Sequence, residues 1–250
     1  MLLLNIQSWS GDIAQGMALA RLFADLEDKP RTDVCVMFTS RFDCPFDEET
    51  ISYVGAKFKT YKFKTKRKAT GWPNGPNQMM GESYEHAIWL KKRGVIPELK
   101  SVMFVEADCV PLHKDWLNML IKEYNECGKE ILGAWLKKGD AGCEHVNGNC
   151  IVSIDFYKRC PAMIHPPTRG GWDAMLAYAI LPNAAPSKLI WSDYRLGTSD
   201  NEWKGCDYLW NPKRYGTPSN ALYGQELYPC YIHGTKTMHG LECARKRLIK

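Results

Sequence analysis

Two carboxylates close the most apolar stretch of this chain. Residues 101–106 read Ser-Val-Met-Phe-Val-Glu, and Asp108 follows two residues after Glu106. An uninterrupted apolar run predicts a strand buried on both faces, and ligands bind beyond the carboxyl ends of such strands. Side chains at i and i+2 of an extended backbone point to the same side. Glu106 and Asp108 therefore suit Mg²⁺ or Mn²⁺, and the alternative is a pair of solvated loop acids.

The elements before this strand predict an α/β domain. Residues 2–7 and 33–39 have the composition of strands, and a helical pattern lies between them. Together they form a right-handed βαβ unit. Asp12 and Gln15 are expected to cap its helix. Trp9, in the loop after the first strand, is a candidate either to stack on a base or to cap the core.

The segment 57–68 has the most unusual composition in the chain. It carries seven basic residues and no acidic ones, interleaved with Phe58, Tyr61 and Phe63. A strand would place Tyr61 and Phe63 on one face and lysines on the other. The lysines could protect an edge strand from aggregation. Alternatively, they could bind the phosphates of a nucleotide diphosphate or of a nucleic acid.

The second half of the chain continues the alternation with weaker patterns. Helical spacing follows Asn77, which is expected to cap that helix. A polar turn at 144–149 leads into an apolar strand, and two glycines introduce a short helix with Asp173 in its first turn. From 182 to 229 the periodicity is weak. This stretch is predicted to be irregular.

Composition limits the class of protein. A chain of 250 residues with 45% hydrophobic and 24% charged residues fits a single globular domain. It opens on four apolar residues, too few for a secretory signal, and no apolar run approaches the roughly 20 residues of a membrane span. The ten cysteines include no Cys-x-x-Cys pair, so reduced thiols and a cytoplasmic location are expected. A zinc site is the alternative for Cys143, His145, Cys150 and Cys160.

Taken in order, these motifs resemble the glycosyltransferases of the GT-A fold over residues 1 to about 240. Glu106-Ala107-Asp108 stands where that family has its DxD motif. Three later segments resemble motifs of glycogenin-like members. Asn147-Gly148-Asn149 resembles their Asn-Ala-Gly turn, and Gly171-Trp172-Asp173 resembles their acidic Asp-Gln-x-x-Leu segment. His233-Gly234-Thr235-Lys236 resembles their His-x-x-Gly-x-x-Lys motif. The resemblance implies a mixed, mostly parallel sheet with helices on both faces.

The resemblance also implies an activity, the metal-dependent transfer of a sugar from a UDP-sugar to an acceptor hydroxyl. Asp108, Glu106 and His233 would hold the metal, and Asp173 would act with Asp108 in catalysis, as base for the acceptor or by orienting the donor sugar. Contacts with the nucleotide sugar are expected from Gln7, Ser8, Trp9, Lys64, Lys66, Arg67, Asn77, Glu106 and Lys236. Contacts with the acceptor are expected from His145, Asn147, Gly148, Asn149 and Trp172.

Within one domain, the resemblance assigns the nucleotide to residues 1–112 and the acceptor to residues 113–250. Size, the basic segment and the basic tail resemble phage-type glycosyltransferases that modify hydroxymethylated pyrimidines, so DNA is the expected acceptor, with its base extruded. No membrane or protein partner is expected. Two alternatives are a non-catalytic nucleic-acid-binding protein and a sugar-nucleotide pyrophosphorylase of the same fold. Residues 8–12 lack the Gly-rich, Arg-containing loop of the latter.

Overall fold

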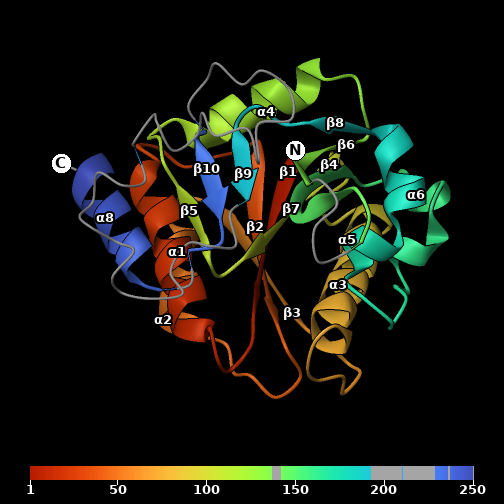
Figure 1. Ribbon diagram of the computed structural model, residues 1–250. Coiled ribbons are helices and arrows are strands. Elements are labelled where there is room, and N and C mark those ends of the chain that lie inside the picture. The colour runs from red at the N-terminus through yellow and green to blue at the C-terminus, as the bar shows by residue number, and fades with distance from the viewer. Residues whose placement is uncertain (137–141, 193–209, 211–228, 236, 250) are drawn as a thin grey trace.

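A seven-stranded mixed sheet forms the centre of the molecule (Figure 1). The computed structural model describes residues 1–136, 142–192, 210, 229–235 and 237–249. The strand order is β3-β2-β1-β4-β7-β6-β8. The bounds are β1 Leu2–Ser8, β2 Val34–Ser40, β3 Lys59–Lys64, β4 Ser101–Glu106, β6 Ile131–Leu136, β7 His145–Ser153 and β8 Ala184–Pro186.

Most neighbouring strands of this sheet run parallel. The pairs β1·β2, β1·β4, β2·β3 and β6·β8 are parallel, and β7 runs antiparallel to both β4 and β6. The carboxyl ends of β1, β2, β3 and β4 therefore meet at one edge. A smaller sheet in the order β5-β10-β9 lies beside that edge, formed by Cys109–Pro111, Tyr231–His233 and Ile190–Ser192.

Helices cover both faces of the central sheet, as the sequence predicts (Figure 1). One apolar core packs α1 (Ile13–Leu26), α2 (Glu48–Gly55), α4 (Trp116–Glu126) and α8 (His239–Leu248) against the sheet. A second core packs α3 (Asn74–Lys92), α5 (Trp172–Met175) and α6 (Ala177–Ile180) on the opposite face. Short 3₁₀ helices follow at Phe156–Lys158, Pro161–Met163 and Leu181–Asn183.

The side-chain pattern of β3 confirms the two faces expected for it. β3 is an edge strand that pairs only with β2 among the described residues. Phe63 is buried and Tyr61 half-buried, whereas Lys62 and Lys64 are exposed. No helix in the described part of the chain is long and apolar enough to cross a membrane.

Two of the expected helix caps are wrong. The carboxylate of Asp12 does not cap α1 but accepts the backbone N–H of Trp9 at 2.8 Å, and Gln15 donates to the carbonyl of Thr235 at 2.7 Å. Asn77 lies inside α3, which begins three residues earlier at Asn74. Long-range hydrogen bonds take the side chains of Gln15 and Asn77, whereas the Asp12 carboxylate is taken by a backbone N–H only three residues earlier.

The composition of residues 41–50, with a proline and several acids, is typical of a loop, but helix α2 begins within this stretch at Glu48. Its amino end carries a clear cap, because the Asp47 carboxylate accepts the backbone N–H of Thr50 at 3.0 Å. Glu48 and Glu49 follow in the first turn, where acidic side chains stabilise the helix dipole.

Candidate active site

The site is assembled where β4 ends and the small sheet begins. β4 ends at Glu106, the chain turns at Ala107 and Asp108, and β5 starts at Cys109. The antiparallel pairing of β10 with β5 places His233 opposite Cys109. The parallel pairing of β10 with β9 places His233 opposite Ser192. These two registers bring a histidine from the end of the chain to the carboxylates at its middle.

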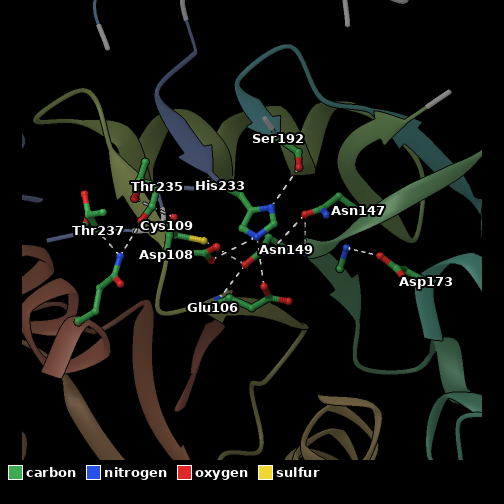
Figure 2. Close-up of polar contacts among 12 residues, drawn as sticks. Glu106, Asp108, Cys109, Asn147, Asn149, Asp173, Ser192, His233, Thr235 and Thr237 are labelled. Carbon is green, nitrogen blue, oxygen red and sulfur yellow. Dashed lines mark hydrogen bonds and ion pairs between the residues drawn. The ribbon is translucent and has the colours of Figure 1, made fainter. Parts of the chain in front are cut away.

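Glu106, Asp108 and His233 point toward one another (Figure 2). The imidazole Nε2 of His233 lies 3.1 Å from a carboxylate oxygen of Glu106 and 3.2 Å from one of Asp108. One ligand atom from each residue lies within 4.8 Å of the other two, the separation expected of groups that share a cation. The predicted metal residues therefore come together in space.

The two carboxylates favour the protonated form of His233, and a cation bound at Nε2 would have to replace that proton. Burial by itself would lower the pKa of His233, but the two carboxylates raise that pKa to about 10. On the other side of the ring, Nδ1 lies 3.0 Å from the hydroxyl of Ser192. Partners on both nitrogens fix the orientation of the ring.

The donor set fits a divalent cation. Carboxylate oxygens from Glu106 and Asp108 are the ligands that Mg²⁺ and Mn²⁺ prefer, and an imidazole nitrogen favours Mn²⁺ over Mg²⁺. The orienting contact from Ser192 has the form that commonly supports a metal-bound histidine. The alternative zinc residues, Cys143 and its neighbours, form no such cluster within the described part of the chain.

The buried side-chain amide of Asn149 supports the turn that carries Glu106 and Asp108. Asn149, on β7, has no exposed surface. Its side-chain oxygen accepts the backbone N–H of Glu106 at 2.8 Å and the thiol of Cys109 at 3.0 Å. Its side-chain nitrogen donates to the side-chain oxygen of Asn147 at 3.2 Å. Asn149 thus holds both ends of the turn that carries Asp108.

The backbone after β10 closes on the same turn. The carbonyl oxygen of Asp108 accepts the N–H groups of Gly234 at 3.1 Å and Thr235 at 2.9 Å, and the Thr235 hydroxyl at 2.9 Å. Gly234 has a φ of 109°, a region that favours glycine. Gln15 of α1 anchors Thr235 through its carbonyl. Contacts from β7, from the residues after β10 and from α1 therefore fix the turn that carries Asp108.

Asp173 lies apart from the metal cluster, on the side of β7 (Figure 2). Its carboxylate accepts the backbone N–H groups of Gly148 at 3.0 Å and Ala174 at 2.9 Å. Burial raises the pKa of Asp173, and the positive charge available on His145 opposes the rise. A half-buried carboxylate with a raised pKa is a suitable proton acceptor for a hydroxyl near neutral pH.

The other residues predicted for the acceptor are mostly buried. His145 is 6% exposed, and its Nδ1 lies 3.1 Å from the carbonyl of Cys143. Trp172 is 7% exposed and packs edge-on against Phe104, with ring centroids 5.7 Å apart. Asn147 is buried beside Asn149. Their direct contacts with an acceptor stay predictions, and the structure assigns them contacts within the protein.

Among the predicted nucleotide residues at the end of β1 and just after it, Trp9 is the accessible one. Gln7 is buried and donates to the Ser83 hydroxyl at 3.3 Å, and Ser8 is 3% exposed. Trp9 is 43% exposed, and the guanidinium of Arg41 lies 5.1 Å from its ring centroid. Trp9 is thus an exposed aromatic ring where β1 and β2 end, and the Arg41 beside it is half-buried and paired with Asp43 at 2.6 Å.

The remaining predicted nucleotide residues that the structure describes lie on β3, in the loop after it and on α3. Lys64 lies over the ring of Phe46, 5.6 Å from its centroid, on the side of α2. Lys66 and Arg67 lie in the loop after β3. The carboxamide of Asn77 is engaged with the protein, since it donates to the carbonyls of Pro167 and Gly170 and accepts from Trp172 N–H: the distances are 2.6, 2.8 and 3.0 Å. Lys236 lies outside the described residues.

Two residues of the site carry no clear sequence signal. Ser192 falls in the weakly patterned region and reaches His233 only through strand pairing. Asp12 lies near the carboxylate pair, and its pKa is raised to about 6, first by burial and then by the charges of Asp108 and Glu106. The loop position of Asp12 after the first strand was the one available signal for it.

Comparison with known proteins supports the fold. No protein-family model and no curated protein matches the sequence. S. aureus TarS 1-349 is similar in structure with a TM-score of 0.51 and 14% identity, over 74% of this chain and 57% of that chain. The glycosyltransferase GlyE of Streptococcus pneumoniae is similar with a TM-score of 0.50 and 10% identity, over 93% of this chain and 54% of that one.

These similarities, with the sheet described above, show a GT-A-like fold. The chain spans little more than half the length of either protein. At such low identity, the likeness extends to the arrangement of strands and helices.

Proposed function

We propose that this chain is a metal-dependent glycosyltransferase that moves a sugar from a nucleotide sugar, a UDP-sugar, to an acceptor hydroxyl. The observation that carries the proposal is the cluster of Glu106, Asp108 and His233 at the carboxyl end of a central strand in a GT-A-like fold. GlyE, which this fold resembles, is itself a glycosyltransferase. The cluster lies at the sheet edge where open α/β folds bind ligands.

In this proposal each residue of the cluster has a distinct role. A divalent cation, when bound, neutralises the charge that develops on a leaving diphosphate. Asp108 and His233 would hold that cation from buried positions, and Glu106 would hold it from the exposed side. Asn149 and Ser192 would position the ligands without touching the substrate. Contact of Lys236 with the diphosphate stays a prediction.

Asp173 is the proposed base for the acceptor hydroxyl. Its two backbone hydrogen bonds fix the carboxylate, and its raised pKa makes it a better proton acceptor than an ordinary aspartate. The alternative role, orienting the donor sugar, would use the same carboxylate as a hydrogen-bond acceptor. Loss of transfer with retained slow hydrolysis of the donor in an Asp173→Asn variant would favour the base.

The experiment for this activity is release of UDP from a panel of UDP-sugars. We expect release with Mn²⁺, its loss with EDTA and its recovery when Mn²⁺ is restored. His233→Ala should abolish release, whereas His113→Ala, which removes an exposed histidine outside the cluster, should leave it unchanged. Equal release by both variants would exclude His233 from the site.

For the acceptor we propose a 5-hydroxymethylpyrimidine base in DNA, with the reaction in the cytoplasm. The basic segment 57–68 supports an anionic acceptor, because it carries seven cations and no acid. Hydroxymethylated and unmodified oligonucleotides, incubated with the donor panel, distinguish the outcomes by mass. Sugar added only to the modified strand is expected, and no mass gain with an active donor site would reject this acceptor alone.

A further inference from the structure

The positive charge of this protein is concentrated in one segment. The formal net charge is +5, and residues 57–68 contribute seven basic side chains with no acidic one. The rest of the chain is therefore net −2. Such a concentration marks a local surface and not a generally basic protein.

The structure divides this segment into a strand and a loop with different surroundings. On the strand, Lys62 pairs with the carboxylate of Glu48 at 2.9 Å, and Lys64 lies against Phe46. In the loop, Lys66, Arg67 and Lys68 are all exposed. Among the described residues, the one carboxylate that pairs with this loop is Glu82, which lies 3.4 Å from Arg67.

Side chains of helix α3 hold the backbone of this loop through hydrogen bonds. The buried carboxylate of Glu82 accepts the backbone N–H groups of Lys66 at 2.6 Å and Arg67 at 3.3 Å. One helical turn earlier, the side-chain oxygen of Gln78 accepts the N–H of Ala69 at 2.8 Å, and its nitrogen donates to Glu82 at 2.8 Å. The backbone donors of the loop face inward, so its side chains project outward.

The same helix connects the basic loop to the proposed base. Asn77 of α3 holds the carbonyls of Pro167 and Gly170 and the N–H of Trp172, the residue before Asp173. The guanidinium of Arg67 lies 3.3 Å from the imidazole of His165, at the start of that second loop. Arg67 of the basic loop therefore contacts the loop that leads to Asp173.

An exposed aromatic side chain follows this loop along the chain. Trp72, four residues after Lys68, is 77% exposed. β3 lies three strand spacings from β4, which is about 14 Å at the usual strand separation. A single diphosphate bound at Asp108 does not extend that far. The loop is suited instead to a longer anionic ligand with rings that can stack.

We propose that the loop 66–68, together with Trp72, binds a single-stranded nucleic acid. Cations contact the backbone phosphates, and an unstacked base lies on the indole of Trp72. A duplex would offer phosphates but no free base face. The inference rests on the proposed function only in taking this strand as the acceptor, since the binding itself requires neither donor nor metal.

The test is fluorescence anisotropy of a labelled thymidine oligonucleotide of about 20 residues with the full chain in EDTA. Lys66→Gln, Arg67→Gln and Lys68→Gln together should weaken binding by about tenfold or more and reduce the salt dependence by about two units. A matched triple variant changes three exposed lysines on other elements to glutamine, Lys122, Lys188 and Lys246. It carries the same net charge, +2, and should bind as the unmodified protein does.

Several outcomes would overturn the proposal. If both triple variants lost the same affinity for the oligonucleotide, binding would depend on net charge and not on this loop. If the loop variant lost no affinity, the oligonucleotide would bind elsewhere. Trp72→Ala should weaken binding by about tenfold; an unchanged affinity would leave a site for polyanions without base stacking. Displacement of the oligonucleotide by UDP with Mn²⁺ would assign the loop to the donor site. If the protein bound the oligonucleotide but not UDP, the proposed donor site would be rejected and the nucleic-acid site would stand.

Discussion

The metal cluster and the basic loop lie at the same edge of the sheet, yet they use buried charge in opposite ways. In the cluster the buried groups are the proposed ligands, because the side chains of His233 and Asp108 are only 3% and 11% exposed. In the loop the buried group is the support, since Glu82 is 7% exposed and Arg67 is 60% exposed. A convergent buried site suits a small cation, and an outward-facing set of cations suits a large anion.

The largest effect is expected from Asp173→Asn, which removes the proposed base and leaves the metal cluster intact. Sugar transfer should fall by roughly 10²–10⁴-fold, the usual contribution of general base catalysis. UDP affinity should not change. Steady-state kinetics together with calorimetry would show this, and Asp28→Asn, at a carboxylate 80% exposed, is the matched control. Loss of UDP affinity would place Asp173 in the donor site instead.

Asn149→Ala should weaken metal binding by the cluster, because it removes a hydrogen-bond acceptor that supports the turn carrying Asp108. It removes the acceptor of the Glu106 N–H and of the Cys109 thiol in a position with no exposed surface. Mn²⁺ affinity should fall by about 10- to 100-fold, and stability by about 1–3 kcal/mol. Metal titration and urea unfolding would measure the two effects.

The control for that change is Asn118→Ala, because Asn118 is exposed on α4 and bonds only to Asp115 among the described residues. It should alter Mn²⁺ affinity by less than about twofold. If Asn149→Ala lost stability but kept its Mn²⁺ affinity, the amide would support the fold and not the metal turn.

Ser192→Ala should have a smaller effect on the same cluster. Its hydroxyl is one partner of the His233 ring, and removing an orienting partner costs about tenfold in metal affinity. Ser192→Thr keeps a hydroxyl and should restore most of the affinity in a Mn²⁺ titration. Failure of the threonine variant to recover any affinity would indicate a packing role for Ser192.

The smallest effect is expected from Lys62→Gln, which compares a lysine on strand β3 with the cations of the loop 66–68. Lys62→Gln breaks an exposed ion pair with Glu48, so it should change the free energy of unfolding by less than about 1 kcal/mol. Because Lys62 lies on the strand, oligonucleotide affinity should change by less than about twofold. A loss as large as that of the loop variant would extend the nucleic-acid surface along β3.

The sequence predicts the central sheet well because its strands are marked by local composition. The stretch 2–7 forms β1, and the apolar run before Glu106 is buried as expected. Parallel strands buried on both faces read as continuous apolar runs, which need no long-range information. The alternation of Phe63 with exposed lysines on β3 is marked in the same way.

The site depends on contacts that local patterns do not contain. The resemblance brings Asp108 and His233 together, but Ser192 joins them through the register of two three-residue strands. Asn149 and Asn77 are predicted to contact ligands, but their side chains form hydrogen bonds within the protein. Their partners, Glu106 and Trp172, are 43 and 95 residues away along the chain. Which polar side chain faces a ligand and which one holds a loop is decided by tertiary packing.

We propose that Asp108 and its neighbours form a metal-dependent nucleotide site. Calorimetric titration with UDP tests it directly, first with Mn²⁺ and then with EDTA. We expect binding only with the metal, and a loss of about 100-fold or more in Asp108→Asn, because that residue supplies a buried ligand. UDP binding that persists in EDTA, or an Asp108→Asn variant with unchanged affinity, would exclude a metal-dependent nucleotide site at Asp108.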